Sequence, residues 1–227
     1  RAKAAFDSIE VCAKKNLTAA GFMEDSAGFR AISNSKGLFG YNRATSVDFS
    51  VTVRTADGTG SGYALRDVTD TGRLNTRQAT EVAAQKAAAS VNAKALEPGK
   101  YTVILEATAA AVLMEQLFFS MDARSADEGR SFLSKPGGKT KLGEKIVDSR
   151  VTIYSDPTNP ELPASPWAND GQAQQRINWI EKGVVKNMAY SRYWAQKQGK
   201  KPVPFPDNLL MAGGTASLEE MIKSTQR

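Results

Sequence analysis

The residues 111–133, AVLMEQLFFSMDARSADEGRSFL, bring carboxylates into an apolar segment of the sequence. Helical spacing places Glu115, Phe119 and Asp122 on one face of the helix expected there. Two carboxylates on one face could share the roles of general acid and general base. A solvated or salt-bridged helix face explains the same spacing and is the commoner case. The carboxylates alone therefore predict no catalytic site.

An apolar stripe in the same segment predicts a helix over residues 108–123 that packs into a core. The stripe consists of Ala110, Leu113, Leu117 and Met121, with Met114 and Phe118 beside it. Without further information, a core helix is the simplest interpretation of this segment.

The segment also resembles the zinc motif of the TldD/PmbA peptidase family. The catalytic branch of that family has H-E-x-x-x-H, a short connection and then G-x-S. Aligned without a gap, the glutamate is Glu115, and the two histidine positions hold Met114 and Phe119. The later glycine and serine correspond to Gly129 and Ser131. Because the chain has no histidine at all, the resemblance implies a peptidase-family fold without a zinc site of its own.

The resemblance extends over nearly the whole chain and is closest to the PmbA branch, also called TldE. The family-like stretches are NSKGL, EPGKYTVILE, DEGRSF, LGEKI, TIYSDP, SPWANDGQAQQR, IEKGVVKN and SRYWAQKQG. It implies an excerpt of a larger two-domain protein, and a start at Arg1 instead of methionine favours the same interpretation. Residues 1–97 would be the end of the N-terminal α+β domain, and residues 98–227 the first part of the metallopeptidase-like C-terminal domain.

The missing histidines decide what chemistry we expect. A catalytic zinc takes about three protein ligands and acidifies a bound water, while a glutamate accepts the proton. Met114 is too soft and neutral to hold zinc in this way, and Phe119 has no ligand atom. Glu115 then has no metal-bound water to activate. The family's remaining ligand comes from a segment beyond Arg227. We therefore expect no catalytic, cofactor or metal-binding residue in this chain.

The spacing of the motif raises a point of geometry. Residues five apart lie about 140° apart around a regular α-helix. The catalytic branch should therefore have a looser, π-like turn at the motif. An unbroken α-helical ladder from Met114 to Phe119 would show that this chain lacks such a turn.

The function that the resemblance implies is that of a non-catalytic or degenerate subunit. It would form a dimer with a zinc-bearing TldD-like subunit or with itself, and take part in cleaving extended or unfolded peptides in the cytoplasm. Zinc is expected only in the catalytic partner. One alternative is an active zinc metallopeptidase whose ligands lie outside this chain. Another is a regulator that binds nucleic acid or DNA gyrase, a label that family members carry.

Charge and cysteine content narrow these alternatives. The net charge is +6, but 30 basic residues are interleaved with 24 acidic ones, so a mildly basic surface is favoured over nucleic-acid binding. A nucleic-acid regulator would need a continuous basic face built from Lys135, Lys139, Lys141, Arg192, Lys200 and Lys201. The single cysteine, Cys12, is expected to be buried and reduced. No apolar run approaches the length that spans a membrane.

The expected elements come in blocks, which favours the α+β class with antiparallel or mixed sheets and packed helices. The helices are expected at 2–15, at 75–92 with Asn75 or Thr76 as the cap, at 108–123, around the sequence YWAQKQG, and from Ser217 onward. The strands are expected at 17–24, 28–33, 38–44, 46–54, 60–66, 101–106, 150–154, 174–181 and 184–191, with turns at EDSAG (24–28) and NSKG (34–37). The last two should form a hairpin at Glu181, Lys182 and Gly183. The glycines of DGTGSG are interpreted as a hairpin turn.

Overall fold

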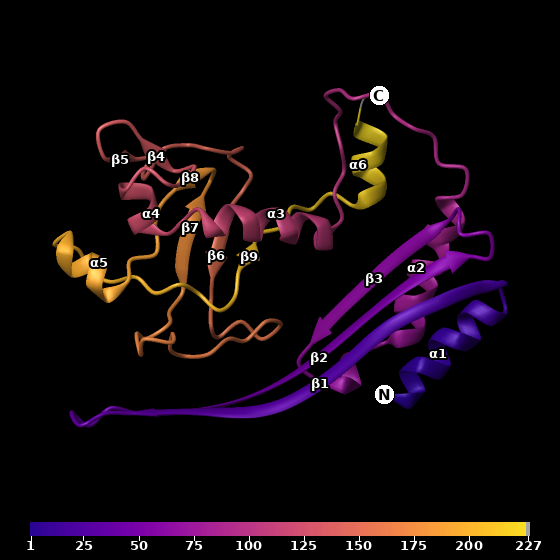
Figure 1. Ribbon diagram of the computed structural model, residues 1–227, viewed down its shortest axis with the longest axis horizontal. Helices are drawn as coiled ribbons and strands as arrows, with labels where there is room; N and C mark the ends of the chain where they lie inside the picture. The colour runs from indigo at the N-terminus through magenta and orange to yellow at the C-terminus, as the bar shows by residue number, and fades with distance from the viewer. Residues whose placement is uncertain (226–227) are drawn as a thin grey trace. The chain divides into compact units, whose positions relative to one another are not determined.

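The computed structural model describes residues 1–225 and divides into two compact units. Unit 1 is Arg1–Lys100 and unit 2 begins at Tyr101 (Figure 1). Each unit combines helices with antiparallel sheets, so the α+β class is confirmed. The assignment of residues 1–97 to the end of an N-terminal domain stays a prediction.

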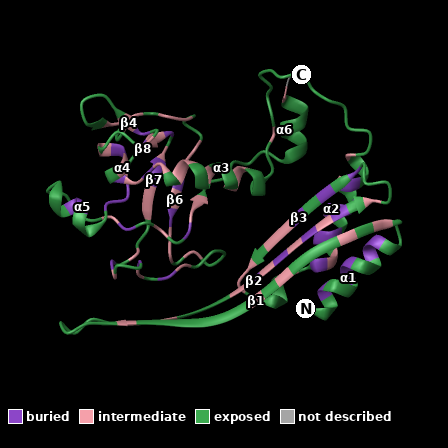
Figure 2. Ribbon diagram, viewed as in Figure 1, coloured by how far each residue is buried: buried purple, intermediate pink, exposed green. Residues whose placement is uncertain are grey.

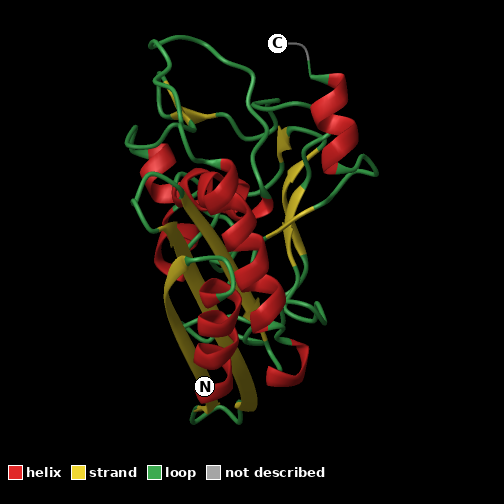
Figure 3. Ribbon diagram, turned by 90° about the vertical axis from the view of Figure 1, so that its right-hand side faces the viewer, coloured by secondary structure: helices red, strands yellow, loops and turns green. Residues whose placement is uncertain are grey.

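Unit 1 is a three-stranded antiparallel sheet with two helices on one face. Its elements are α1 (Ala2–Ala13), β1 (Leu17–Ser33), β2 (Phe39–Thr55), β3 (Ser61–Val68), the 3-10 helix η1 (Thr71–Arg73) and α2 (Thr76–Ala89). The strand order is β1-β2-β3, and α1 and α2 lie on the same side of the strands (Figure 3). Period-two alternation buries Val47, Phe49, Val51 and Val53 beneath these helices.

Helix α2 packs its backbone closely against the start of β3. A Cβ atom on Gly62 would lie 2.0 Å from the Ala83 carbonyl oxygen and 2.6 Å from the Ala87 nitrogen. A Cβ atom on Gly60 would lie 2.3 Å from the Ala87 carbonyl oxygen. Of the DGTGSG glycines, Gly58 has the positive φ of a turn residue, at 73°. The other two glycines instead allow the α2 backbone to lie directly on the strand.

The strand boundaries expected in unit 1 are partly wrong. Residues 24–28 form no turn, because β1 pairs with β2 without interruption from Leu17 opposite Thr55 to Ser33 opposite Phe39. The expected strands 38–44 and 46–54 are likewise one strand. Polar and glycine residues are tolerated there because a long partner strand supplies the hydrogen bonds, whatever the side chains.

Unit 2 has a core around Trp179, Met121 and Leu133, which are fully buried. Its elements are α3 (Ala107–Phe119), α4 (Ala123–Asp127), β4 (Ser134–Lys135), β5 (Lys139–Thr140), β6 (Ile153–Ser155), β7 (Ile177–Glu181), β8 (Val184–Val185), α5 (Arg192–Lys197), β9 (Leu210–Met211) and α6 (Leu218–Ser224). Strands β4 and β5 form a small hairpin, and a second sheet has the order β8-β7-β6-β9. Much of this unit is irregular chain held by local turns.

The hairpin expected at Lys182 and Gly183 and the helix expected from Ser217 are both present in unit 2, and Ser191 adds a local cap that was not predicted. The β7–β8 hairpin turns at Lys182 and Gly183, whose φ angles are 48° and 78°, as a two-residue turn with left-handed positions requires. Ser191 caps α5 by accepting a hydrogen bond from the Trp194 nitrogen. Ser217 and Glu220 form a capping box at the start of α6.

Three predictions in unit 2 are wrong. The expected strand 184–191 is a strand only at Val184–Val185, because its pairing with strand β7 ends at Val185. Residues 101–106 form no strand, because no neighbouring strand pairs with them. The expected helix 108–123 ends at Phe119, and the chain restarts as α4 after Asp122. Among the described residues, no helix is both long and apolar enough to cross a membrane.

Candidate functional site

Helix α3 carries the degenerate zinc motif and rests on the unit 2 core along one side only. Met114, Leu117 and Phe118 are partly buried and pack against the core cluster. None of the residues of α3 is fully buried, and Leu113, which was expected in the buried stripe, is exposed. The buried stripe is therefore rotated toward Met114 and Phe118. Figure 2 shows the mixture of exposed and intermediate residues along this helix.

Phe118 is the main anchor of the motif helix. Its ring meets the Trp179 ring edge to face, with centroids 5.1 Å apart, and the Phe205 ring in the same manner at 5.7 Å. The indole nitrogen of Trp179 donates a hydrogen bond to the Ser155 hydroxyl at 3.1 Å. Such aromatic pairs stabilise a contact beyond the apolar area that they bury. The orientation of α3 is therefore set by three aromatic rings.

The chain after α3 is fixed by backbone pairing and a new cap. The Ala189 nitrogen donates to the Met121 carbonyl oxygen, and the Ala123 nitrogen donates to the Ala189 carbonyl oxygen, both at 2.9 Å. The Asp122 carboxylate accepts a hydrogen bond from the Ser125 nitrogen at 2.7 Å and so caps α4. Asp122 thus lies outside the motif helix, and the idea of a shared face with Glu115 is wrong.

The G-x-S part of the motif has a structural role at this point. Gly129, with a φ of 79°, ends α4. The Arg130 nitrogen bonds to the Ser125 carbonyl oxygen at 2.8 Å, the long hydrogen bond of a Schellman motif. The Ser131 hydroxyl then donates to the Ser120 carbonyl oxygen at 2.6 Å. Gly129 and Ser131 together tie the chain after α4 to the end of the motif helix.

The three motif positions do not converge on one point. Residues 107–119 form an uninterrupted α-helix, so no π-like turn occurs in this described segment. Met114 faces the core, whereas Phe119, five residues later and about 140° around the helix, is 73% exposed. Glu115 is also exposed, and its carboxylate makes no hydrogen bond or ion pair within residues 1–225.

The residues at the motif do not fit a catalytic zinc ion. Met114 presents a thioether to the core, Phe119 has no ligand atom, and the two side chains diverge. Within residues 1–225, no group of three or more His, Cys, Asp or Glu residues could hold a metal ion. The only cysteine, Cys12, is buried in unit 1.

Charged groups near the motif form a local network around Glu128. Arg124 and Arg130 bind this carboxylate at 2.9 and 2.6 Å, and the Arg124 hydrogen bond is the main cause that holds the pKa of Glu128 below its usual value. Asp127 accepts a hydrogen bond from the Trp194 indole nitrogen at 2.8 Å. These carboxylates brace α4 and α5, which is a structural role.

A hollow beside Phe118 was not predicted from the sequence. It has a volume of about 220 Å³ and is lined by Ala168, Gln172, Val203, Pro204 and Phe205, with Asp170 and Asp207 among the polar groups. Phe205 also contacts Phe118, so the hollow adjoins the motif helix. The proline-rich sequences SPWAND and PVPFP were the signals that could have indicated it.

Two family models cover nearly the whole sequence. The PmbA/TldA metallopeptidase central domain matches residues 2–95, and the PmbA/TldA metallopeptidase C-terminal domain matches residues 98–227. The chain therefore belongs to the PmbA/TldD metallopeptidase family.

Individual relatives agree with this assignment. A metalloprotease from Archaeoglobus fulgidus is 33% identical over 110 residues, which are 48% of this chain and 25% of that protein. A Thermotoga maritima crystal structure, described as a candidate modulator of a DNA gyrase, has a TM-score of 0.85 at 25% identity and covers 97% of this chain and 53% of its own.

TldE from Thermococcus kodakarensis shares the fold, with a TM-score of 0.80 at 21% identity over 98% of this chain and 54% of that one. The present chain thus spans about half the length of these two solved structures.

Proposed function

We propose that this chain is a non-catalytic subunit of a PmbA/TldD-type peptidase and acts beside a zinc-bearing, TldD-like subunit. The observation that carries this proposal is the motif helix, where Met114 and Phe119 occupy the two histidine positions and point in different directions. The chain belongs to the family, while both histidine positions of the motif hold other residues. A family member without the zinc ligands would contribute surfaces that bind the partner subunit or the peptide.

The substrates under this proposal are extended or unfolded peptides. An open sheet edge accepts such a peptide through backbone hydrogen bonds, which tolerate varied sequence. Both units of this chain contain antiparallel sheets with open edges in the residues described. The partner is a TldD-like subunit, with a second copy of this chain as the other form of dimer to be tested.

Two other functions have weaker support. An active peptidase with all its ligands elsewhere would leave the motif helix without a use. The gyrase-related description of the Thermotoga maritima protein favours a nucleic-acid role. However, several of the basic residues expected to form a face are engaged locally: Lys135 pairs with Glu144, and the Arg192 guanidinium lies 3.8 Å from the Asp170 carboxylate. The Lys141 ammonium group lies 4.0 Å from the centre of the Phe132 ring.

Metal content tests the proposal directly. The chain is purified alone and together with a zinc-bearing family partner, and zinc is measured by elemental analysis. We expect no zinc in the chain alone and stoichiometric zinc in the complex. Stoichiometric zinc bound to the chain alone would overturn the proposal, because it would require a ligand set that the motif helix does not supply.

Glu115 provides a second test. Glu115→Gln should leave peptide cleavage by the complex nearly unchanged, because the proposal places the zinc and its bound water on the partner subunit. The same change at the motif glutamate of the zinc-bearing partner is the matched control and should abolish cleavage. A large loss of activity from Glu115→Gln, with the circular dichroism spectrum unchanged, would assign a catalytic role to this chain.

A further inference from the structure

The hairpin of β1 and β2 extends well past the rest of its sheet. The two strands pair over their full lengths, from Leu17 to Ser33 and from Phe39 to Thr55. The third strand, β3, covers β2 only from Val47 to Arg54. Residues 26–45 therefore form a two-stranded projection, here called the distal ribbon. Figure 2 shows it as mostly exposed on both strands.

One face of the distal ribbon is aromatic and uncovered. Strand alternation carries the buried face of unit 1 outward, so that Phe39 and Tyr41 continue the row begun by Val47 and Phe49. Phe29 lies on the same face from β1. Phe29 and Phe39 are each 73% exposed and Tyr41 is 54% exposed. The Phe29 and Tyr41 rings stack at 6.0 Å.

The distal ribbon is also positively charged. Arg30, Lys36 and Arg43 lie between Asp25 and Asp48, and this stretch contains no acidic residue. With three basic residues and no acidic residue, the stretch has a formal charge of +3. Residues 182–206 of unit 2 also lack acidic residues, so the ribbon is distinguished by the combination of positive charge with an exposed aromatic strand face.

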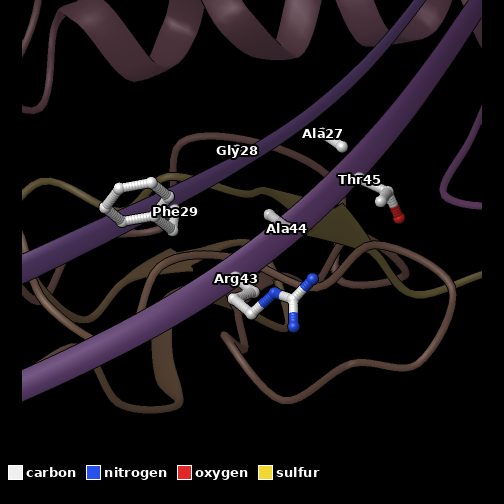
Figure 4. A pocket seen from close by; sticks show the side chains of 6 residues that line it. All are labelled: Ala27, Gly28, Phe29, Arg43, Ala44 and Thr45. Carbon is white, nitrogen blue, oxygen red and sulfur yellow. The ribbon is translucent and has the colours of Figure 1, made fainter.

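Arg43 and the aromatic face meet at one point. Phe29 and Arg43 are directly opposite each other on the two strands, and both line a shallow hollow of about 240 Å³ with Ala27, Gly28, Ala44 and Thr45 (Figure 4). Arg43 is exposed and has no ion-pair partner among residues 1–225. A ligand here would meet a cation and an aromatic ring together.

We infer that the distal ribbon is a docking surface for an extended, acidic polypeptide with apolar side chains at alternate positions. In the described residues, no strand pairs with either outer edge of residues 26–45. Either edge can therefore accept a strand through backbone hydrogen bonds. Alternate apolar side chains would cover Phe29, Phe39 and Tyr41. Carboxylates would be attracted to the +3 charge.

Charge decides between the occupants of this surface. A second copy of the ribbon would bring +3 against +3, and like charges oppose association. Nucleic acid requires several phosphate contacts on one side, whereas strand alternation places Arg30 and Arg43 on opposite faces of the ribbon. An acidic peptide strand satisfies the backbone edge, the aromatic face and the charge at the same time.

This inference names a class of peptide substrate for the proposed function. It rests on that function only in taking the ligand to be a peptide. The binding assay needs neither the zinc-bearing subunit nor cleavage. Failure of the metal-content test would therefore leave the ribbon inference standing, and failure of the ribbon assay would leave the non-catalytic role standing.

The experiment is fluorescence anisotropy of the full chain with a labelled peptide that alternates glutamate with valine and phenylalanine. A matched peptide has lysine in place of each glutamate, and labelled single-stranded DNA is the third probe. We expect the acidic peptide to bind most tightly, and more weakly at high salt. Arg43→Glu should weaken this binding by about tenfold. Arg54→Glu, the same change on the same strand outside the ribbon, should have no such effect.

Four outcomes would overturn the inference. They are equal binding of the two peptides, unchanged binding by Arg43→Glu, tighter binding of DNA that is lost in Arg43→Glu, and a dimer in analytical ultracentrifugation that Arg43→Glu alters. Phe39→Ser gives an independent check. Phe39 lies opposite Ser33 and outside the Phe29–Tyr41 stack. Its loss should weaken peptide binding with little change in folding, so unaltered binding by this variant would also contradict the inference.

Discussion

Helices α2 and α3 differ in how their composition relates to their burial. Helix α2 (TRQATEVAAQKAAA) is rich in alanine and polar residues, yet it buries Thr76, Ala79, Thr80, Ala83, Ala84 and Ala87. Helix α3 (ATAAAVLMEQLFF) is far more apolar, yet none of its residues is fully buried. The difference lies in the surface that each helix meets. Helix α2 lies on a strand whose glycines admit its backbone, whereas α3 touches its core with the side chains of one side only.

The largest expected effect comes from closing the space beneath α2. Gly62→Ala places a Cβ atom 2.0 Å from the Ala83 carbonyl oxygen, so backbone must move, at a cost of about 3 kcal/mol. Guanidinium unfolding followed by far-UV circular dichroism should show unit 1 unfolding earlier. Tryptophan fluorescence should not shift, because all three tryptophans belong to unit 2.

The control for this change is Gly28→Ala. No atom lies within 4 Å of a Cβ atom at Gly28, so stability should change by less than about 0.5 kcal/mol. Equal effects of the two glycine substitutions would contradict the direct contact of α2 with β3.

The next effect comes from removing the anchor of α3. Phe118→Ala deletes the edge-to-face contacts with Trp179 and Phe205. Since Phe118 is only partly buried, we expect a loss of about 2 kcal/mol, below the value for a fully buried phenylalanine. Tryptophan fluorescence is the measurement, because Trp179 reports directly on this contact. An unchanged unfolding midpoint would mean that α3 is held by its backbone ends alone.

A smaller, pH-dependent effect is expected where α1 meets α2. Asp7 accepts hydrogen bonds from Lys3 at 2.7 Å and from Thr76 at 2.8 Å, and these lower its pKa from the ordinary value of 3.8. Because the pKa is lowered, the ionised carboxylate stabilises the folded state at pH values above 3.8. This stabilisation is lost as the pH falls through the pKa of the folded state. Asp7→Asn should therefore cost about 1 kcal/mol at neutral pH.

The control for Asp7 is the pH profile itself. The difference in unfolding free energy between the native chain and Asp7→Asn should shrink as the pH falls below 3.8. A difference that is constant across this range would show that the carboxylate charge contributes nothing.

The smallest effect is expected on the open side of α3. Phe119 follows Phe118 directly but is 73% exposed, so Phe119→Ala should change stability by less than about 0.5 kcal/mol. Thermal unfolding of both single variants, measured side by side, compares two identical side chains one position apart. A loss as large as that of Phe118→Ala would indicate that Phe119 is covered in solution by a partner or a second copy.

Most helix ends and tight turns could be predicted from the sequence, and most strand limits could not. Asn75, Ser191 and Ser217 cap helices through hydrogen bonds from residues three positions ahead, so their signals are local. The turn expected at residues 24–28 is absent because strand β2 pairs through that region. A long-range partner thereby overrode a local preference for a turn.

The candidate site also has features that the sequence determines and features that the tertiary structure determines. The lack of histidine, and with it the replacement of both ligand positions by Met114 and Phe119, is a property of the sequence alone. The tertiary structure decided that Met114 faces the core while Glu115 and Phe119 face outward. It also decided that Asp122 begins a new helix and that Ser131 holds the end of the old one. Ligand chemistry depends on residue type, whereas burial and direction depend on which distant surface the helix meets.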